Sequence, residues 1–257
     1  MKISNLFDLT GKVAIVTGGA NGIGKATAIL LAKAGASIAI GDFKLEDAEK
    51  TAKEIQELGV KAIAVSCNVL KDAELVNLVE TTVKELGGIH ILINNAGGGG
   101  GGRENPFKIS VDDIKRDYEL NVFSGWRLCQ LCVPYMKKAG YGSIVFTTSM
   151  SSINKSPNMS GYAGSKASVN HMAANLAHDF GPEVRINCVG PGATRTAALE
   201  SVLTPEIEKT MLAHTPIKRL GTSDDIAGAM LYFACPISEW VSGQTIFVNG
   251  GGVQTLD

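Results

Sequence analysis

The chain lacks the features that mark several classes of protein. Its 257 residues contain no apolar run long enough to cross a bilayer, and residues 1–12 have no apolar stretch of the kind found in secretory signals. The formal net charge is only −1, which leaves no excess of basic residues to attract nucleic acid. We therefore expect a globular cytoplasmic protein that binds neither a membrane nor nucleic acid.

Cysteine is scarce, and its number is odd. Five cysteines are spread along the chain, which argues against a disulfide framework. Cys129 and Cys132 have C-x-x-C spacing, but they lie in an apolar helical stretch without a second pair or a histidine at zinc-ligand spacing. We expect these thiols to pack in the core, and we expect no metal site.

Strand patterns alternate with helix patterns along the whole chain. Apolar, β-branched runs predict seven strands, at 12–17, 37–42, 62–66, 89–93, 143–148, 184–189 and 244–248. Helical periodicity predicts helices at 25–34, 45–58, 71–86, 111–139, 159–180, 199–213 and 223–234. Such alternation is typical of a parallel sheet with helices on both faces. The predicted fold class is α/β: one doubly wound Rossmann-type domain over residues 1–257, with about seven strands in the order 3-2-1-4-5-6-7.

A glycine-rich turn joins the first predicted strand to the first helix. Gly18 permits a tight turn, Gly22 lets the backbone approach a phosphate, and Gly24 lets the helix pack on the sheet. A pyrophosphate would lie at the helix N-terminus, where free N–H groups and the helix dipole favour an anion. Any tight strand-to-helix loop can use glycine, so the phosphate-binding interpretation depends on the predicted strand before the turn and the predicted helix after it.

Asp42 ends the second predicted strand, 18 positions after Gly24. A carboxylate there accepts hydrogen bonds from the ribose hydroxyls of adenosine and repels a 2′-phosphate. No arginine lies near the turn, and Lys25 and Lys44 are the nearest cations. The predicted cofactor is therefore NAD in preference to NADP, the alternative being a solvated carboxylate at a strand end.

Six consecutive glycines, Gly97–Gly102, follow the fourth predicted strand. Ordering them costs much backbone entropy, which is consistent with a surface loop. Ligands of open α/β sheets, however, lie outside the carboxyl ends of the strands. We therefore favour a flexible wall beside a ligand.

Tyr162 and Lys166 form a Tyr-x-x-x-Lys pair on the predicted helix 159–180. A spacing of four places phenol and ammonium one turn apart on one face. A nearby cation lowers the pKa of a phenol, which ordinarily lies near ~10, so that it can exchange a proton at neutral pH. The spacing is common by chance, so only the remaining motifs give it meaning.

Those motifs occur in the order of one family. The chain resembles the short-chain dehydrogenases/reductases in its Thr17-Gly-x-x-x-Gly-x-Gly turn, in Asn94-Asn-Ala-Gly, and in Pro191-Gly with Thr196. Ser149 lies thirteen positions before Tyr162, as is typical of the family. The resemblance implies hydride transfer between a secondary alcohol and a nicotinamide, with a catalytic tetrad of Asn121, Ser149, Tyr162 and Lys166. Its implied roles are a general acid/base for Tyr162, a hydrogen bond to the substrate oxygen from Ser149, pKa control and ribose binding by Lys166, and a relay water held by Asn121.

The resemblance also implies which residues surround NAD. They are Gly18, Asn21, Gly22, Ile23, Gly24, Asp42, Phe43, Asn68, Val69, Asn95, Ala96, Gly97, Tyr162, Lys166, Pro191, Gly192, Thr194 and Thr196. Two departures stand out. Asn68 replaces the usual aspartate at the adenine, and Thr194 replaces the usual valine or isoleucine two positions after Gly192. Arg195 beside Thr194 adds a cation that is uncommon in the pattern, either to meet a substrate carboxylate or to point into solvent.

Local features narrow the substrate. The segments around Asn94, Tyr118, Ser149–Met159 and Thr204–Ile217 resemble bacterial family members that oxidise the 7α-hydroxyl of bile acids with NAD. By that likeness Gly99, Ser149, Asn154 and Tyr162 contact a sterol, residues 199–214 cover it, and the chain forms a homotetramer through its long helices. A hydroxyl at position 3 or 12 stays possible. The alternatives are a reductase of 3-oxoacyl thioesters or polyols, and a non-catalytic NAD-binding protein, which would be expected to have lost members of the tetrad.

Overall fold

Seven parallel strands form one sheet in the computed structural model, which describes residues 3–99 and 104–252. Their order is β3-β2-β1-β4-β5-β6-β7, so the predicted topology is confirmed. The strands are β1 (Val13–Thr17), β2 (Ser37–Asp42), β3 (Ala62–Ser66), β4 (Ile91–Asn94), β5 (Gly142–Thr147), β6 (Val184–Pro191) and β7 (Thr245–Val248). The order reverses between β1 and β4, which is where a doubly wound sheet opens a ligand crevice.

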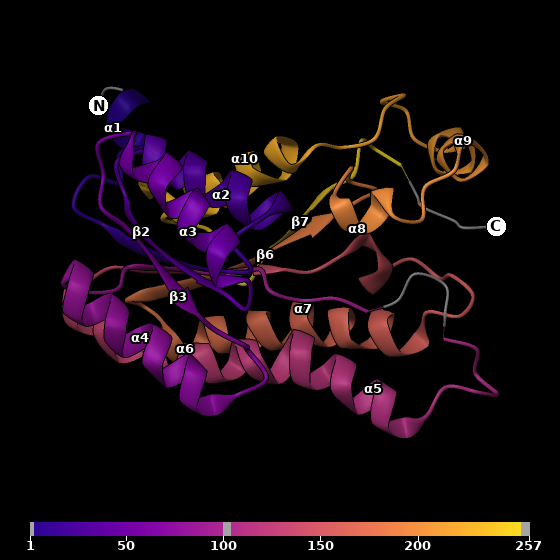
Figure 1. The fold of residues 1–257 in the computed structure, drawn as a ribbon, viewed down its shortest axis with the longest axis horizontal. Helices are drawn as coiled ribbons and strands as arrows, with labels where there is room; N and C mark the ends of the chain where they lie inside the picture. Colours follow the sequence, from indigo (N-terminus) through magenta and orange to yellow (C-terminus); the bar gives the residue numbers. More distant parts are fainter. Residues whose placement is uncertain (1–2, 100–103, 253–257) are drawn as a thin grey trace.

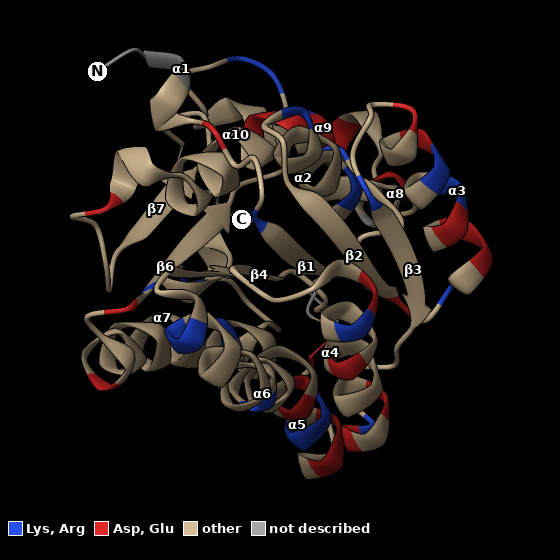
Figure 2. Cartoon of the chain, turned by 90° about the vertical axis from the view of Figure 1, so that its left-hand side faces the viewer, with Lys and Arg blue, Asp and Glu red and all other residues tan. Residues whose placement is uncertain are grey.

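Helices cover both faces of the sheet (Figures 1 and 2). On one face lie α2 (Gly22–Lys33), α3 (Leu45–Gln56) and α10 (Ser223–Ala234); on the other lie α4 (Asp72–Leu86), α6 (Ser124–Ala139) and α7 (Ser160–Phe180). Each layer has its own apolar core. Neighbouring residues of β1 show the division, since Ile15 belongs to one cluster and Val16 to the other. All five cysteines are buried and unpaired, and Cys129 and Cys132 lie in the core as predicted.

Two of the predicted helices are interrupted, so their predicted extents were wrong. The stretch 111–139 consists of α5 (Val111–Tyr118), a π-helix (Glu119–Phe123) and α6. The stretch 199–213 consists of α8 (Ala197–Glu200) and α9 (Pro205–Ala213). Thr204 caps α9 by accepting the N–H of Ile207 at 3.3 Å, and Pro205 occupies its first turn, so a new helix begins there.

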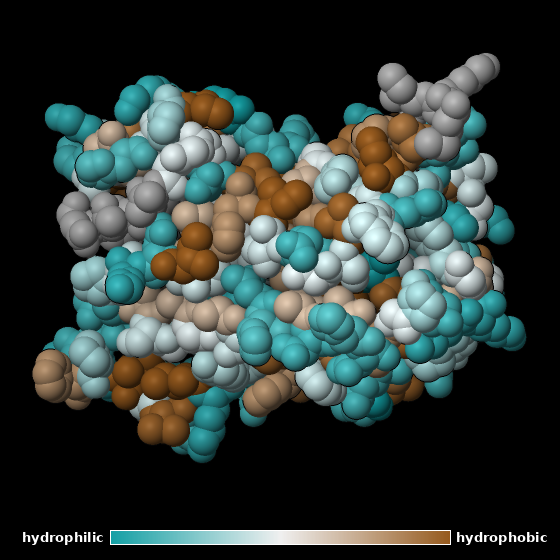
Figure 3. All heavy atoms as spheres, turned by 180° about the vertical axis from the view of Figure 1, so that it is seen from behind, coloured by the Kyte–Doolittle hydropathy of each residue, from teal (hydrophilic) through white to brown (hydrophobic). Residues whose placement is uncertain are grey.

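The remaining elements are short. They are α1 (Ile3–Leu6) and the 3₁₀ turns Met150–Ser152 and Pro236–Ser238. No helix within the described ranges is both long and apolar enough to span a membrane. Figure 3 views the molecule from its β7 side, where small apolar patches are separated by hydrophilic side chains.

The carboxyl ends of the strands meet at one end of the molecule. Figure 1 shows α8, α9 and the N-terminal end of α7 at that end, while the N-terminus of the chain lies at the other. The fold therefore gathers the glycine turn, the Tyr162 helix and the 197–213 segment around one crevice.

Candidate active site

A cleft of about 550 Å³ opens beyond the carboxyl ends of the central strands. Among the predicted site residues, those that line it are Asn21, Gly22, Ile23, Asn95, Gly97, Gly99, Ser149, Asn154, Tyr162, Lys166, Pro191, Gly192, Thr194 and Thr196. Those outside its lining are Gly18, Gly24, Asp42, Phe43, Asn68, Val69, Ala96 and Asn121. The structure thus brings most of the predicted set to one cavity and places the rest beneath it or beside it.

The glycine turn leaves the start of α2 open toward the cleft. Gly22 has a φ of +56°, and a Cβ built there meets only Thr196 Cγ2 at 3.8 Å. A Cβ on Gly24, by contrast, would overlap the Gly18 carbonyl and approach Asn95 Nδ2 to 2.6 Å. The side chain of the N-cap residue Asn21 makes no capping hydrogen bond, so the first N–H groups of α2 keep their capacity to bind a phosphate.

The Asn95 side chain joins three strand ends. Its Nδ2 donates to the carbonyls of Thr17 and Gly18 at 3.1 and 3.2 Å, and its Oδ1 accepts from Thr147 Oγ1 at 3.2 Å. Thr17 Oγ1 in turn accepts the N–H groups of Asn95 and Ala96, both at 3.1 Å. The glycine turn after β1 is therefore bonded directly to the residues that end β4 and β5.

Asp42 lies buried at the end of β2, against the glycine turn. Its Oδ2 accepts the N–H of Ala20 at 3.1 Å and its Oδ1 accepts the N–H of Lys44 at 3.0 Å. A carboxylate offers about four acceptor positions, so two stay available for a pair of ribose hydroxyls. Beside it Phe43 is 71% exposed, a flat apolar surface of the kind that an adenine can stack on.

Asn68, the residue that departs from the family pattern, is held in a turn of its own. Its Oδ1 accepts the N–H of Leu70 at 3.0 Å, and its N–H donates to Glu74 Oε2 at 2.7 Å. Val69 beside it is buried. The Asn68 oxygen therefore has one lone-pair direction left for an adenine amino group.

Tyr162, Ser149 and Lys166 meet at the floor of the cleft. The Tyr162 phenol, in the first turn of α7, is hydrogen-bonded to the side chain of Ser149. Ser149 follows β5 and also accepts the N–H of Ser151 at 3.1 Å. Lys166 Nζ lies 5.8 Å from the centre of the Tyr162 ring and donates to the Thr147 carbonyl at 2.9 Å.

The predicted lowering of the phenol pKa by Lys166 stays a prediction, because burial is the largest effect on the Tyr162 phenol in the protein chain alone. Burial raises the pKa of Tyr162; the hydrogen bond from Ser149 opposes that rise, and the charges of Asp117 and Glu104 add to it. Burial also lowers the pKa of the Lys166 ammonium to about 8. The ammonium is directed at a carbonyl and not at the phenol oxygen, so desolvation dominates both groups.

Asn121 braces the cleft from the π-helix. Its Nδ2 donates to the Gly98 carbonyl at 2.9 Å and to Ser165 Oγ at 3.0 Å, while its Oδ1 accepts the N–H of Gly98 at 3.0 Å. A Cβ on Gly97 would lie 2.8 Å from that Oδ1 and 3.1 Å from Lys166 Nζ. Glycine at position 97 therefore lets the loop pass between Asn121 and Lys166.

The outer part of the cleft is largely apolar. Met159 precedes α7, and Leu199, Val202 and Met211 come from the α8–α9 segment, while Asn154 and Gly99 supply polar or small positions. The Arg195 side chain is 48% exposed, which fits the solvent-facing alternative, and it is also held by two ion pairs. Its guanidinium pairs with Glu200 at 3.0 Å and with Glu208 at 2.8 Å, which links α8 to α9.

The identities of these apolar contacts were not predicted residue by residue. The sequence indicated a substrate-covering segment at 199–214, and nothing in its periodicity shows which side chains face the cleft. Glu104, which contacts the start of α7, was also missed, because 57 positions separate it from Gly161.

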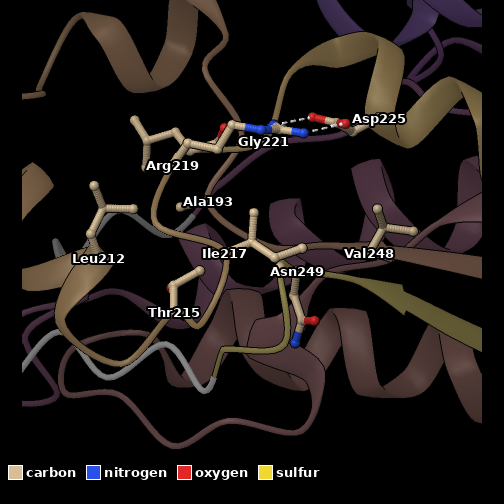
Figure 4. Close-up of a pocket in the computed structure, with 11 residues that line it drawn as sticks. Ala193, Leu212, Thr215, Ile217, Arg219, Gly221, Asp225, Val248 and Asn249 are labelled. Carbon is tan, nitrogen blue, oxygen red and sulfur yellow. Dashed lines mark hydrogen bonds and ion pairs between the residues drawn. The ribbon is translucent and has the colours of Figure 1, made fainter.

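A second, smaller cavity lies apart from the tetrad (Figure 4). Its volume is about 100 Å³, and Ala193, Leu212, Ile217 and Val248 are among the residues that line it. At its rim Arg219 forms a two-pronged ion pair with Asp225, at 2.6 and 2.9 Å. The cavity lies between the α9 segment and the end of β7, and none of the predicted catalytic residues lines it.

Comparison with known proteins gives the class. A family model described as enoyl-(acyl carrier protein) reductase matches residues 18–252. Together with the sheet order and the tetrad residues around one cleft, this shows that the chain belongs to the short-chain dehydrogenases/reductases.

Individual relatives are closer still. The chain is similar to the 7alpha-hydroxysteroid dehydrogenase of Escherichia coli K12, with 48% identity over 250 residues that cover 97% of each protein. It also resembles the solved structure of a 7alpha-hydroxysteroid dehydrogenase complexed with NADH and 7-oxo glycochenodeoxycholic acid, with a TM-score of 0.95, 47% identity and 100% coverage of both chains. A 3-oxoacyl-[acyl-carrier-protein] reductase of Thermotoga maritima is 34% identical over 244 residues, which cover 95% of this chain and 98% of that protein.

Proposed function

We propose that the protein is an NAD-dependent hydroxysteroid dehydrogenase that oxidises the 7α-hydroxyl of a bile acid and reduces the 7-oxo product in reverse. The observation that carries this proposal is the 48% identity to a 7alpha-hydroxysteroid dehydrogenase over 97% of both chains. The tetrad side chains and an apolar outer cleft support it.

Bound NAD supplies the hydride acceptor at its nicotinamide ring. Asp42 would hold the adenosine ribose through its two free acceptor positions, and the first turn of α2 would hold the pyrophosphate. Pro191, Gly192, Thr194 and Thr196 line the opposite wall, where the nicotinamide carboxamide would lie. The residues present therefore fit the cofactor.

Proton transfer falls to the floor of the cleft. Ser149 would hydrogen-bond the reacting oxygen, and Tyr162 would take the hydroxyl proton as the hydride leaves carbon 7. Lys166 would bind the nicotinamide ribose. Asn121, bonded to Gly98, fixes the loop beside the ammonium and would hold the relay water at this point.

The outer cleft suits a rigid apolar ligand. Met159, Leu199, Val202 and Met211 offer hydrocarbon surface on two sides, and Lys166 is the only cation among the described residues that line the cleft. A sterol nucleus buries well against such a surface, and its hydroxyl is then the one polar group near Ser149 and Tyr162.

The proposed assembly is a homotetramer in the cytoplasm, with residues 1–257 as one Rossmann-type domain. Phe123 and Trp126 are 59% and 44% exposed, and with Met172 they border an apolar hollow of about 450 Å³ between α6 and α7. Ile246 of β7 is 37% exposed, and Trp240, shortly before that strand, is fully exposed. These two apolar surfaces would be covered by neighbouring subunits.

The test is a turnover assay with NAD and a panel of 3α-, 7α- and 12α-hydroxyl bile acids, free and conjugated, with acyl thioesters and polyols beside them. We expect reduction of NAD, followed by nicotinamide absorbance, only with substrates that carry a 7α-hydroxyl. Turnover confined to thioesters or polyols would refute the sterol assignment and leave the family membership intact.

A further inference from the structure

The catalytic helix α7 begins without a cap of its own. Its N-cap residue, Met159, makes no side-chain capping bond, so the first N–H groups of the helix need acceptors from elsewhere. Glu104 provides them. Its Oε2 accepts the N–H of Gly161 at 2.6 Å and its Oε1 accepts the N–H of Tyr162 at 3.0 Å, so one buried carboxylate serves both donors.

Glu104 is held against the same segment by its backbone. Its N–H donates to the carbonyl of Asn158 at 3.0 Å, just before the helix. A Cβ on Gly161 would lie 3.2 Å from Glu104 Oε2, so position 161 is in close contact with the carboxylate. Three hydrogen bonds therefore fix this residue of the β4–α5 connection to residues 158–162, one of them to Tyr162 itself.

A second carboxyl group shares this position. Asp117 of α5 is hydrogen-bonded to Glu104, and its Oδ2 would lie 3.4 Å from a Cβ on Gly161. Burial raises the pKa of Asp117, and the charges of Glu104 and Asp113 add to the rise, so the Asp117 carboxyl retains a proton more readily than an exposed aspartate would. Both carboxyls also raise the pKa of Tyr162.

The other charged groups around the pair are few within the described residues. Asp113 and Arg116 of α5, with Lys108, line the open groove on the outer side, and Arg116 partly offsets the negative charge at Asp117. On the other side Glu104 accepts the N–H of Tyr162, and the phenol of that residue is bonded to Ser149. The two carboxyl groups therefore contribute a negative electrostatic potential at the phenol.

We infer that Glu104 is a positioning residue for the alcohol oxidation proposed above: it caps α7 at Tyr162 and, with Asp117, holds negative charge beside the phenol, an assignment that rests on the proposed function of this site. It orients the general base by fixing the backbone that carries it. It also sets the pH above which the phenol gives up its proton, because a neighbouring carboxylate opposes the phenolate.

The experiment compares Glu104→Gln and Glu104→Ala with Asp112→Asn, an exposed carboxylate of the same region that pairs only with Lys115 among the described residues. Glutamine is nearly isosteric with glutamate and keeps one acceptor oxygen without the charge. The glutamine variant therefore measures the effect of the charge even where the alanine variant fails to fold. For each protein the kcat–pH profile of alcohol oxidation, the KM and the dissociation constant for NAD are measured.

We expect the acidic limb of the kcat profile to move to lower pH in Glu104→Gln by about half a pH unit or more, with NAD affinity within about twofold of the parent. The kcat of Glu104→Ala should fall about ten- to a hundredfold, because the phenol loses its fixed position. An acidic limb in Glu104→Gln that coincides with that of Asp112→Asn would overturn the assignment, whatever happens to stability.

A failure of this inference can be distinguished from a failure of the proposed function. Where the parent oxidises no hydroxysteroid, the ionisation of Tyr162 is read without turnover, from the ultraviolet difference between each protein and its Tyr162→Phe counterpart. A lower ionisation pH in Glu104→Gln than in the parent supports the inference. Equal values overturn it.

Discussion

Lys166 Nζ donates to the Thr147 carbonyl at 2.9 Å, and the ammonium of this side chain is almost completely buried. Burying the charged ammonium costs free energy, and this cost lowers the pKa of Lys166 from an ordinary 10.5 to about 8. The charged form of Lys166 is thus held at a cost to the stability of the folded state, and the cost depends on pH.

Replacing Lys166 with Met should remove that pH dependence. Between pH 8 and 10.5 the unfolded chain binds more protons at this group than the folded one, so this contribution to the free energy of unfolding rises with pH across that window. Below about pH 8 the native lysine costs about 3 kcal/mol, to order of magnitude. Thermal unfolding from pH 7 to 10.5 should show the stability of Lys166→Met relative to the parent declining as pH rises. A constant difference would contradict the lowered pKa.

Replacing Tyr162 with Phe should nearly abolish turnover. The phenol oxygen is the proposed proton acceptor, and loss of general acid/base catalysis costs about 10²–10⁴-fold in kcat. The ring and its packing stay, so NAD binding by fluorescence quenching should change by about twofold at most. Turnover near that of the parent would refute the assigned role of Tyr162.

Replacing Asp42 with Ala should shift the cofactor preference toward NADP. The substitution removes the carboxylate that repels a 2′-phosphate, and it leaves the Ala20 N–H without its acceptor. We expect the ratio of kcat/KM with NADP to that with NAD to rise at least about tenfold, with a loss of about 1–3 kcal/mol in stability. Glu57→Gln, at an exposed carboxylate that ends α3 on its C-terminal side, is the matched control and should leave the ratio unchanged.

Replacing Gly24 with Ala should weaken both the fold and NAD binding. The new methyl would overlap the Gly18 carbonyl and lie 2.6 Å from Asn95 Nδ2, so the glycine turn must move. Gly228→Ala in the interior of α10 is the control, because its Cβ meets nothing within 4 Å. That variant should gain up to about 1 kcal/mol from helix propensity. Chemical denaturation and NAD titration of both variants check the pair; equal effects would mean that the space around Gly24 does not matter.

The strands were predictable because a parallel sheet buried on both faces leaves continuous apolar runs, as in residues 13–17. The π-helix at 119–123 was not predictable, because its sequence contains no proline or glycine to mark an interruption of the helical pattern. The break before α9 had a signal, the Thr204-Pro205 start, which the apolar periodicity of 199–213 outweighed.

The site divides in the same way. Motif spacing predicts which polar groups reach the cleft, because the strand ends fix their positions. The direction of the Lys166 ammonium depends on a carbonyl in another strand, and the contact of Glu104 with Tyr162 joins residues 58 positions apart. Neither relationship leaves a trace in local sequence, so neither could be predicted from it.

The hydrogen bonds of the Asn95 side chain limit which parts of the site can change independently. They tie the glycine turn to the ends of β4 and β5, so the cofactor half and the proton-transfer half form one piece whose parts cannot be altered separately. Among the described residues, the α8–α9 segment takes no hydrogen bond from that amide and is tied within itself by Arg195. Substitutions at Leu199, Val202 and Met211, which line the cleft from this segment, therefore leave the hydrogen bonds of Asn95 in place.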